Sequence, residues 1–153
     1  MNNELELDHL FESPKEWINA LPAYQKNMVN KLIENTNNLD DAAAQYFNFS
    51  TPNTAPFGAG GKKDLFIENA KKEFYRYICG DEKYTGQRQT LMSGLKPLHT
   101  TVVSSISTAI SSNIGASQVY LAPIIVIFLM GVSTIGKNAW CITYAPEDTG
   151  GNQ

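Results

Sequence analysis

The stretch Val119-Tyr-Leu-Ala-Pro-Ile-Ile-Val-Ile-Phe-Leu-Met-Gly-Val-Ser-Thr-Ile135 decides how this chain folds. It is the most apolar part of a block of 40 residues, from Pro97 to Gly136, that contains no Asp, Glu, Lys or Arg. Removing apolar surface from water is the dominant favourable term in folding. The stretch must therefore be covered by other protein or by lipid.

Three locations satisfy that requirement. A helix that is hydrophobic on all sides is either surrounded by protein or spans a bilayer. The apolar run also meets the length of about 17–25 residues that a transmembrane helix needs. A third arrangement is a hairpin that is concealed in the soluble state and is later inserted into a membrane or buried in a partner. We favour the first arrangement, a core helix.

The spacing of apolar residues divides the uncharged block into two helices. Val103, Ile106, Ile110 and Ile114 follow one another in steps of three and four, which predicts a helix over 98–114. The second half is rich in β-branched residues, which favours strands, but it lacks the turn residues that separate strands. We therefore predict a second helix over about 117–141.

Shorter helices are predicted along the rest of the chain. Ser13 and Glu16 have the spacing of a capping box at the start of a short helix, which Pro22 ends. A helix after Pro22 presents the apolar stripe Leu21, Tyr24, Met28, Val29, Leu32 and Ile33, with Gln25 on its polar side. Further helices are expected at 39–47, capped by Asn38, at 63–79, ended by Gly80, and within 81–94.

These elements predict an all-α protein. We expect a single domain over residues 1–145, a bundle of about six helices around the very hydrophobic helix 117–141. Residues 48–61 contain two Pro and three Gly and are predicted to form a flexible loop. Residues 146–153 are predicted to be a disordered tail.

Charge and cysteine content limit the class of protein. The net charge of −3 argues against a general nucleic-acid binder. Residues 1–61 carry eight acidic and three basic residues, whereas 62–88 carry seven basic and five acidic ones, so copies of the chain can attract each other. Cys79 and Cys141 are too few for a disulfide framework and lack metal-ligand spacing, and residues 1–8 lack the pattern of a secretory signal. We therefore expect reduced thiols and a cytoplasmic location, or membrane association through the C-terminal hydrophobic helix.

No motif in the sequence predicts an enzyme. The glycine-rich loop 57–63 fails as a phosphate loop, because Pro56 stands at the first glycine position and Lys63 at the Ser/Thr position. His9 and His99 do not have zinc spacing. A Cys79–His99 nucleophile pair is conceivable, but a buried cysteine is more often inert packing. We expect no catalytic residue, cofactor or metal, and neither a nucleic acid nor a small-molecule substrate as partner.

The sequence therefore predicts a non-enzymatic protein that acts through protein–protein assembly, as an accessory, adaptor or regulatory subunit. Its partner is another protein or further copies of itself in a homo-oligomer. The alternative is a membrane-active protein, tail-anchored or pore-forming, that acts through residues 117–136; a hydrolase or nucleotide binder using loop 57–63 is a weaker third option. The candidates for the interaction or insertion surface are Val119, Leu121, Ile124, Ile125, Ile127, Phe128, Leu129, Val132, Ile135 and Trp140.

Overall fold

The uncharged block forms two adjacent helices, α5 (His99–Ile114) and α6 (Gln118–Ile135), joined at Gly115. The computed structural model describes residues 8–36, 38–50, 63–93 and 97–145. Within these ranges every regular element is helical, so the predicted all-α class is confirmed. The predicted tail 146–153 and the glycine-rich positions 57–62 lie outside the described residues.

Helix α6 is the centre of the molecule. Ser117 caps its first turn by accepting a hydrogen bond from the Tyr120 amide, 3.1 Å away. Side chains on every face of the helix are buried, including Leu121, Ile125 and Leu129, which are fully inaccessible to solvent. Burial of each such side chain contributes about 1.5–3 kcal/mol before entropy. The core-helix prediction for this stretch is therefore confirmed in the folded chain.

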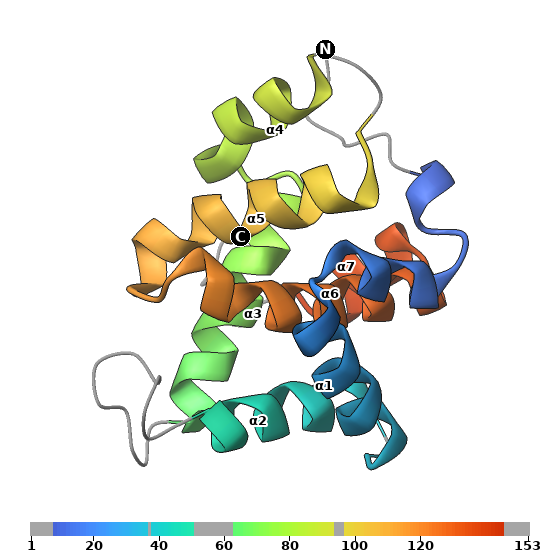
Figure 1. Cartoon of the computed structure of the whole chain (residues 1–153). Helices are drawn as coiled ribbons and strands as arrows, with labels where there is room; N and C mark the ends of the chain where they lie inside the picture. Colours follow the sequence, from blue (N-terminus) through green and yellow to red (C-terminus); the bar gives the residue numbers. More distant parts are fainter. Residues whose placement is uncertain (1–7, 37, 51–62, 94–96, 146–153) are drawn as a thin grey trace.

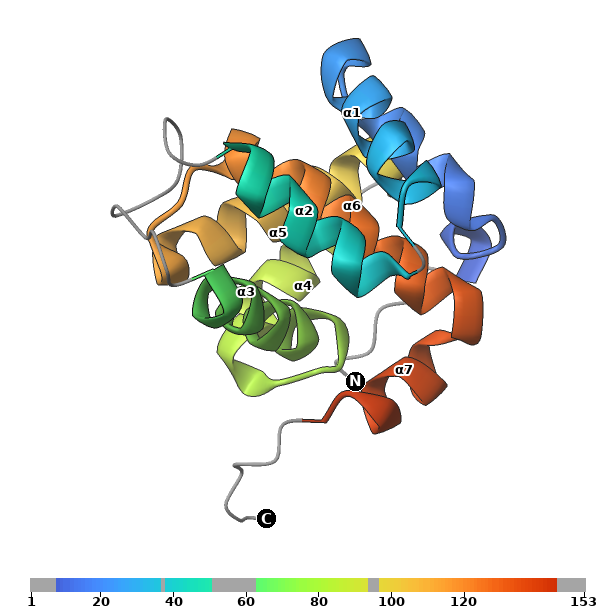
Figure 2. The ribbon, with the colours of Figure 1, turned by 90° about the horizontal axis from the view of Figure 1, so that it is seen from below.

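Most of the other elements pack around α6 (Figure 1). It contacts α5, α2, α7, α1, α3 and the 3-10 helix η2. Figure 2 shows α2 running beside α6, and Figure 1 shows α4 on the side of α5 that faces away from α6. The bounds of the surrounding elements are η1 Asp8–Leu10, η2 Pro14–Ala20, α1 Ala23–Glu34, α2 Leu39–Ser50, α3 Lys63–Ile78, η4 Glu82–Tyr84, α4 Thr85–Met92 and α7 Lys137–Thr143.

The prediction of one helix over 117–141 was wrong at its C-terminal end. Helix α6 stops at Ile135, and a separate helix, α7, begins at Lys137. Gly136 lies between them with φ of +95°, a conformation that residues with a Cβ rarely adopt. The break turns the chain so that Trp140 packs back against the core.

A proline inside α6 explains a buried polar side chain that the sequence did not identify. Pro123 has no amide hydrogen, so it cannot bond to the Val119 carbonyl four residues earlier. The Gln25 side chain reaches across from α1, and its Nε2 donates to that carbonyl at 3.1 Å. Gln25 is consequently only 4% exposed, although helical periodicity placed it on the polar side of α1.

Several predictions for the N-terminal third need correction. Ser13 precedes η2, but its side chain makes no capping bond, so the capping box is wrong. Tyr24 was assigned to the apolar stripe of α1, yet it is 63% exposed because Gln25, Val29 and Leu32 face the core instead. Helix α2 extends to Ser50, which places 48–50 in a helix rather than in the predicted loop. The Asn38 cap is confirmed, since its Oδ1 accepts from the Asp41 amide at 2.8 Å.

Candidate functional site

The ten candidate residues on α6 and α7 divide into core and surface positions. Val119 and Ile135 are exposed by 59% and 47%, whereas the other eight are buried. Those eight can meet a partner directly only where a cleft reaches them or where the fold opens. Four of the ten, Ile127, Phe128, Ile135 and Trp140, line one cleft.

This cleft lies between the start of α2, the second half of α6, and α7, and we refer to it as the α2–α6–α7 cleft. Its volume is about 290 Å³. Most of its lining is apolar, with one ion pair at the side. The residues that line it are Asn38, Leu39, Asp40, Lys71, Ile127, Phe128, Gly131, Thr134, Ile135, Trp140 and Tyr144.

Aromatic rings and a glycine form the floor of the cleft. Phe128 and Trp140 line the cleft. The fully buried ring of Phe74 packs behind them, 5.2 Å from the ring of Phe128 and 5.3 Å from that of Trp140, distances typical of favourable aromatic pairs. Gly131 leaves space above them: a Cβ placed there would lie 3.6 Å from Trp140 Nε1 and 3.7 Å from the Leu39 side chain. An alanine therefore fits at position 131, and a larger side chain would fill the cleft.

A single lysine joins three elements at the side of the cleft. Lys71 Nζ on α3 lies 2.9 Å from Asp40 Oδ1 at the start of α2. The same ammonium group lies 3.9 Å from the centre of the Tyr144 ring, a cation–π distance. Burial raises the pKa of the Tyr144 phenol, and the nearby Asp40 carboxylate raises it further, so the ring stays neutral at physiological pH. Charge at the cleft is thus confined to one internally neutralised pair.

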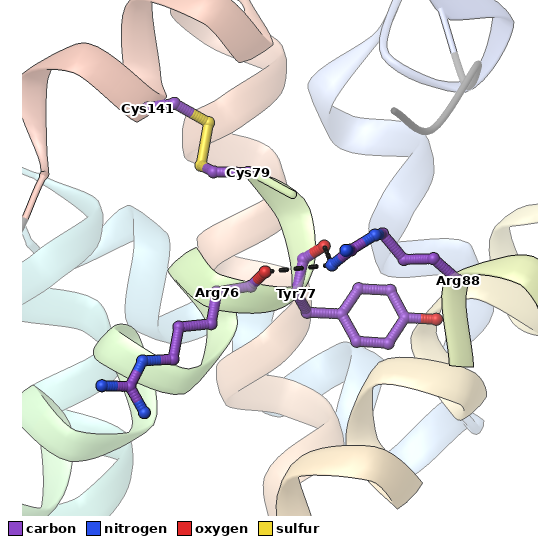
Figure 3. Close-up of a disulfide and its surroundings, with 5 residues drawn as sticks. All are labelled: Arg76, Tyr77, Cys79, Arg88 and Cys141. Atoms are coloured by element: carbon purple, nitrogen blue, oxygen red, sulfur yellow. Dashed lines mark hydrogen bonds between the residues drawn. A yellow bond between two sulfur atoms is a disulfide. The ribbon is translucent and has the colours of Figure 1, made fainter. Parts of the chain in front are cut away.

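A disulfide fixes α7 in this position (Figure 3). Cys79, just after α3, is bonded to Cys141 on α7, with their Cα atoms 5.9 Å apart. The prediction of reduced thiols was therefore wrong. Neither helical periodicity nor the number of cysteines indicated this bond, because 62 positions separate the two residues in sequence. The bond also removes the conceivable Cys79–His99 nucleophile, since the Cys79 sulfur carries no thiol.

The C-terminal end of α3 is held by an arginine that the sequence analysis missed. Arg88 on α4 is 2% exposed. Its Nη1 donates to the carbonyls of Arg76 at 3.1 Å and Tyr77 at 3.0 Å, and its Nη2 to the Asp81 carbonyl at 2.7 Å. Figure 3 shows the guanidinium at the first two of these carbonyls, close to the disulfide. The Arg76 and Tyr77 carbonyls lie in the last turn of α3, where backbone acceptors lack intrahelical donors. The Asp81 carbonyl lies just before η4 and also accepts from the Tyr84 amide at 3.2 Å.

A buried carboxylate on α3 belongs to the same junction. Glu73 is 9% exposed. It accepts from the Tyr84 hydroxyl at 2.6 Å, from Lys83 Nζ at 2.9 and 3.1 Å, and from Arg76 Nη1 at 3.2 Å. Asn113 on α5 donates to the Tyr84 hydroxyl in turn. Both carboxylate oxygens accept hydrogen bonds, and this arrangement is typical of a structural network.

Titratable clusters elsewhere give no support for a metal centre. In the part of the chain that the structure describes, no group of three or more His, Cys, Asp and Glu could hold a metal ion. His9 Nε2 lies 3.3 Å from the Pro97 carbonyl and His99 Nε2 lies 3.1 Å from the Leu10 carbonyl, so both rings tie the N-terminal segment to the start of α5.

One described helix, α6, is long and apolar enough to cross a membrane. Length and composition alone are weak support for a span, because the core helix of a soluble protein has the same properties. Most of α6 is in fact buried inside this fold.

Comparison with protein-family models, with curated proteins and with solved structures gives no match. The fold and the cleft are therefore the observations on which a functional proposal can rest. They define an all-α bundle with a preformed apolar cleft beside a disulfide-anchored helix.

Proposed function

We propose that this protein acts without enzymatic chemistry, by assembling with a second copy of itself through the α2–α6–α7 cleft. The observation that carries this proposal is the combination of an apolar cleft and an exposed apolar side chain on one helix. Ile142 on α7 is 78% exposed, the most of any large hydrophobic residue in the described ranges. Trp140, on the same helix, forms part of the floor of the cleft.

An exposed isoleucine, Ile142, and a residue that lines the cleft, Trp140, lie on the same helix, and this arrangement suits a two-fold symmetric dimer. In such a dimer each copy contributes the same surface, so every contact occurs twice. Ile142 of each copy would enter the cleft of the other, against Ile135 and Tyr144, which are 47% and 37% exposed. Burying two isoleucines contributes about 3–6 kcal/mol to association. The disulfide supports this proposal, because it orders α7 before binding and thereby lowers the entropic cost of association.

Sedimentation equilibrium of the wild type and of Ile142→Asp tests this proposal. We expect the wild type to be a dimer at micromolar concentration, and the variant to dissociate at least about a hundredfold more readily, because each dimer loses two buried isoleucines. Leu98→Asp is the matched control, since Leu98 is 66% exposed but lies at the start of α5. A wild type that stays monomeric, or equal weakening by both variants, would contradict the proposal.

Filling the cleft gives a second, independent test. Gly131→Leu places a side chain against Trp140 and Leu39, so we expect it to weaken the dimer while circular dichroism shows an intact helical fold. Gly131→Ala should leave association nearly unchanged, since a single methyl group fits there in ordinary contact. Full-strength dimers of Gly131→Leu would show that the cleft is not the interface.

A membrane-active role through residues 117–136 is the second candidate, and the length of α6 favours it. The hairpin of α5 and α6 could enter a bilayer only after η2 and α2 leave α6, because these elements contact it in the fold. Dye release from vesicles that contain anionic lipid tests this role. Absence of leakage at neutral and acidic pH, in both oxidised and reduced protein, would remove it.

The expected cytoplasmic location stays a prediction, and the disulfide weighs against it. Disulfides persist in oxidising compartments and are rare in the reducing cytosol. Mass spectrometry of alkylated protein from the native cell would show whether Cys79 and Cys141 are oxidised there.

A further inference from the structure

A second cleft lies on another side of α6, between the start of α1, the first half of α5 and the first turn of α6. Its volume is about 230 Å³, and we refer to it as the α1–α5–α6 cleft. Apolar groups and uncharged polar groups both line it. Its lining residues are Ala20, Leu21, Pro22, Gln25, Thr100, Val103, Ser104, Ser107, Gln118, Val119 and Ala122.

One lining residue carries a buried hydroxyl without a partner. Ser107 is 2% exposed, and its Oγ makes no hydrogen bond. Neighbouring hydroxyls on α5 are bonded: Ser111 donates to the Thr108 carbonyl at 3.0 Å and Ser112 to the Ala109 carbonyl at 3.3 Å. Leaving a buried hydroxyl unpaired costs about 1–3 kcal/mol, so native proteins rarely do so unless a ligand, ion or water completes the bond.

A hydrogen bond between α1 and α6 holds two lining residues of the cleft in place. Pro123 leaves the Val119 carbonyl without an intrahelical donor, and Gln25 is fixed because its amide donates to that carbonyl at 3.1 Å. Gln25 is 4% exposed, which adds a second buried polar side chain to the cleft. The mouth of the cleft is bordered by Val119, which is 59% exposed. The hydrogen bond that the proline makes possible thus holds in place two residues, Gln25 and Val119, that line the same cleft as Ser107.

The chemistry of the lining restricts what can bind. Among the described residues that line this cleft, none is charged, and an ionised ligand buried without a counter-charge is strongly disfavoured. The volume is slightly below the range of about 300–1,000 Å³ that is usual for drug-sized ligands. The occupant should therefore be small and neutral, with an apolar body and an oxygen that accepts a hydrogen bond.

We propose that the α1–α5–α6 cleft binds a small uncharged molecule that has a short acyl chain and a carbonyl oxygen, and that the Ser107 hydroxyl donates to this oxygen. The acyl chain lies against Leu21, Val103 and Ala122. This binding site is separate from the cleft used in the proposed dimer. Failure of dimerisation therefore leaves this proposal intact.

The test is an NMR titration of the ¹⁵N-labelled full chain with hexanamide, which has one carbonyl oxygen and no charge. Saturable shifts are expected at amides of the lining residues. Hexanoate, which has the same chain but carries a charge, should bind at least about tenfold more weakly, because no cation faces it. The absence of saturable shifts up to the solubility limit, or shifts confined to the α2–α6–α7 cleft, would overturn the proposal.

Ser107→Ala separates binding from folding. This variant should melt at the same temperature as the wild type or higher, because it removes an unpaired polar group, yet bind hexanamide about three- to tenfold more weakly through loss of one hydrogen bond. Ser112→Ala is the matched control, since its hydroxyl bonds within α5 and lies outside the cleft. Ala122→Phe, which fills the cleft from α6, should abolish binding. Unaltered affinity in both Ser107→Ala and Ala122→Phe would refute the site.

Discussion

The centre of the molecule and the junction at the end of α3 hold their helices together in opposite ways. In the centre, apolar side chains of α6 such as Leu121 pack among apolar side chains of neighbouring helices, such as Ile106 and Ile110 of α5, all fully buried. At the junction, Arg88 binds three carbonyls, Glu73 accepts four hydrogen bonds, and Cys79 is bonded to Cys141. The centre relies on non-directional burial, whereas the junction relies on particular atoms.

This difference predicts different responses to mutation. A core held by burial accepts other apolar side chains of similar volume at a cost below about 1.5 kcal/mol, but it cannot accept a charge. A junction held by directed bonds loses stability when one donor is removed, even if the replacement has a similar shape. The following predictions test this contrast, from the largest expected effect to the smallest.

Ile127→Lys should have the largest effect. Ile127 is fully buried, and an unpaired buried charge costs several kcal/mol, a loss on the order of the whole stability of a domain of this size. Circular dichroism should show an unfolded or molten chain at 25 °C. Val119→Lys, on the same helix but 59% exposed, should melt near the wild-type temperature. Cooperative melting of Ile127→Lys at the wild-type temperature would disprove the central role of α6.

The double variant Cys79→Ser, Cys141→Ser tests the covalent part of the junction. The disulfide closes a loop that spans 62 positions, and its removal should cost about 4 kcal/mol through the entropy of the unfolded chain. Urea unfolding of the oxidised wild type and of this variant measures the difference. Addition of a reductant should destabilise the wild type by the same amount and leave the variant unaffected. If the reductant also destabilised the variant, the effect of the reductant could not be attributed to the Cys79–Cys141 disulfide.

Arg88→Ala tests the hydrogen-bonded part of the junction. It removes the guanidinium donor from the carbonyls of Arg76, Tyr77 and Asp81, although the Arg76 and Asp81 carbonyls keep the amides of Asp81 and Tyr84 as donors. We expect a loss of about 3 kcal/mol in the free energy of unfolding. Arg76→Ala is the contrasting variant, because the Arg76 side chain is 35% exposed and its buried partner Glu73 keeps the hydrogen bonds from Lys83 and Tyr84. We therefore expect a smaller loss, of about 1 kcal/mol. Equal losses in the two variants would show that burial of the guanidinium is unimportant.

High pH should weaken both regions slightly through their tyrosines. Burial raises the pKa of Tyr46, which donates to the Tyr120 carbonyl in the centre, and of Tyr84, which donates to Glu73 at the junction. A pKa that is raised in the folded state keeps its stabilising effect below the unfolded value of about 10 and loses it as the pH rises above that value, by at most about 1.4 kcal/mol per pH unit for each group.

Urea midpoints at pH 8 and pH 10.5 measure this effect. We expect the free energy of unfolding of the wild type to fall by on the order of 1 kcal/mol between these pH values, with a lower urea midpoint. The fall should be smaller in Tyr84→Phe, which has one fewer phenol to ionise. Tyr46→Phe should give a similar reduction in the centre. A wild-type midpoint that rises between these two pH values would contradict the sign of the prediction.

Helix positions were predicted well where short-range pattern decides them. Steps of three and four located α5 over 99–114, and Gly80 correctly marked the end of α3. Local pattern failed where a distant contact decided the outcome. Gln25 is buried because it donates to the Val119 carbonyl on α6, which Pro123 leaves without an intrahelical donor. Tyr24 is exposed because the face of α1 that contains Gln25 packs against the core.

The candidate sites show the same division. The sequence identified the apolar residues of α6 and Trp140, four of which line the α2–α6–α7 cleft. It did not identify Lys71 and Tyr144 beside them, or the cleft at Ser107, because these come from elements far apart in the chain. No spacing rule connects residues whose proximity depends on how whole helices pack.

The amino-acid sequence alone determined that this protein is helical and that residues 119–135 require cover, because hydrophobic periodicity and transfer from water act within one segment. The tertiary structure alone decided which helix faces are exposed to solvent, that Cys79 and Cys141 are bonded, and where the α2–α6–α7 cleft and the α1–α5–α6 cleft lie. These features depend on the relative placement of several helices, and packing fixes that placement through contacts between residues that lie far apart in sequence.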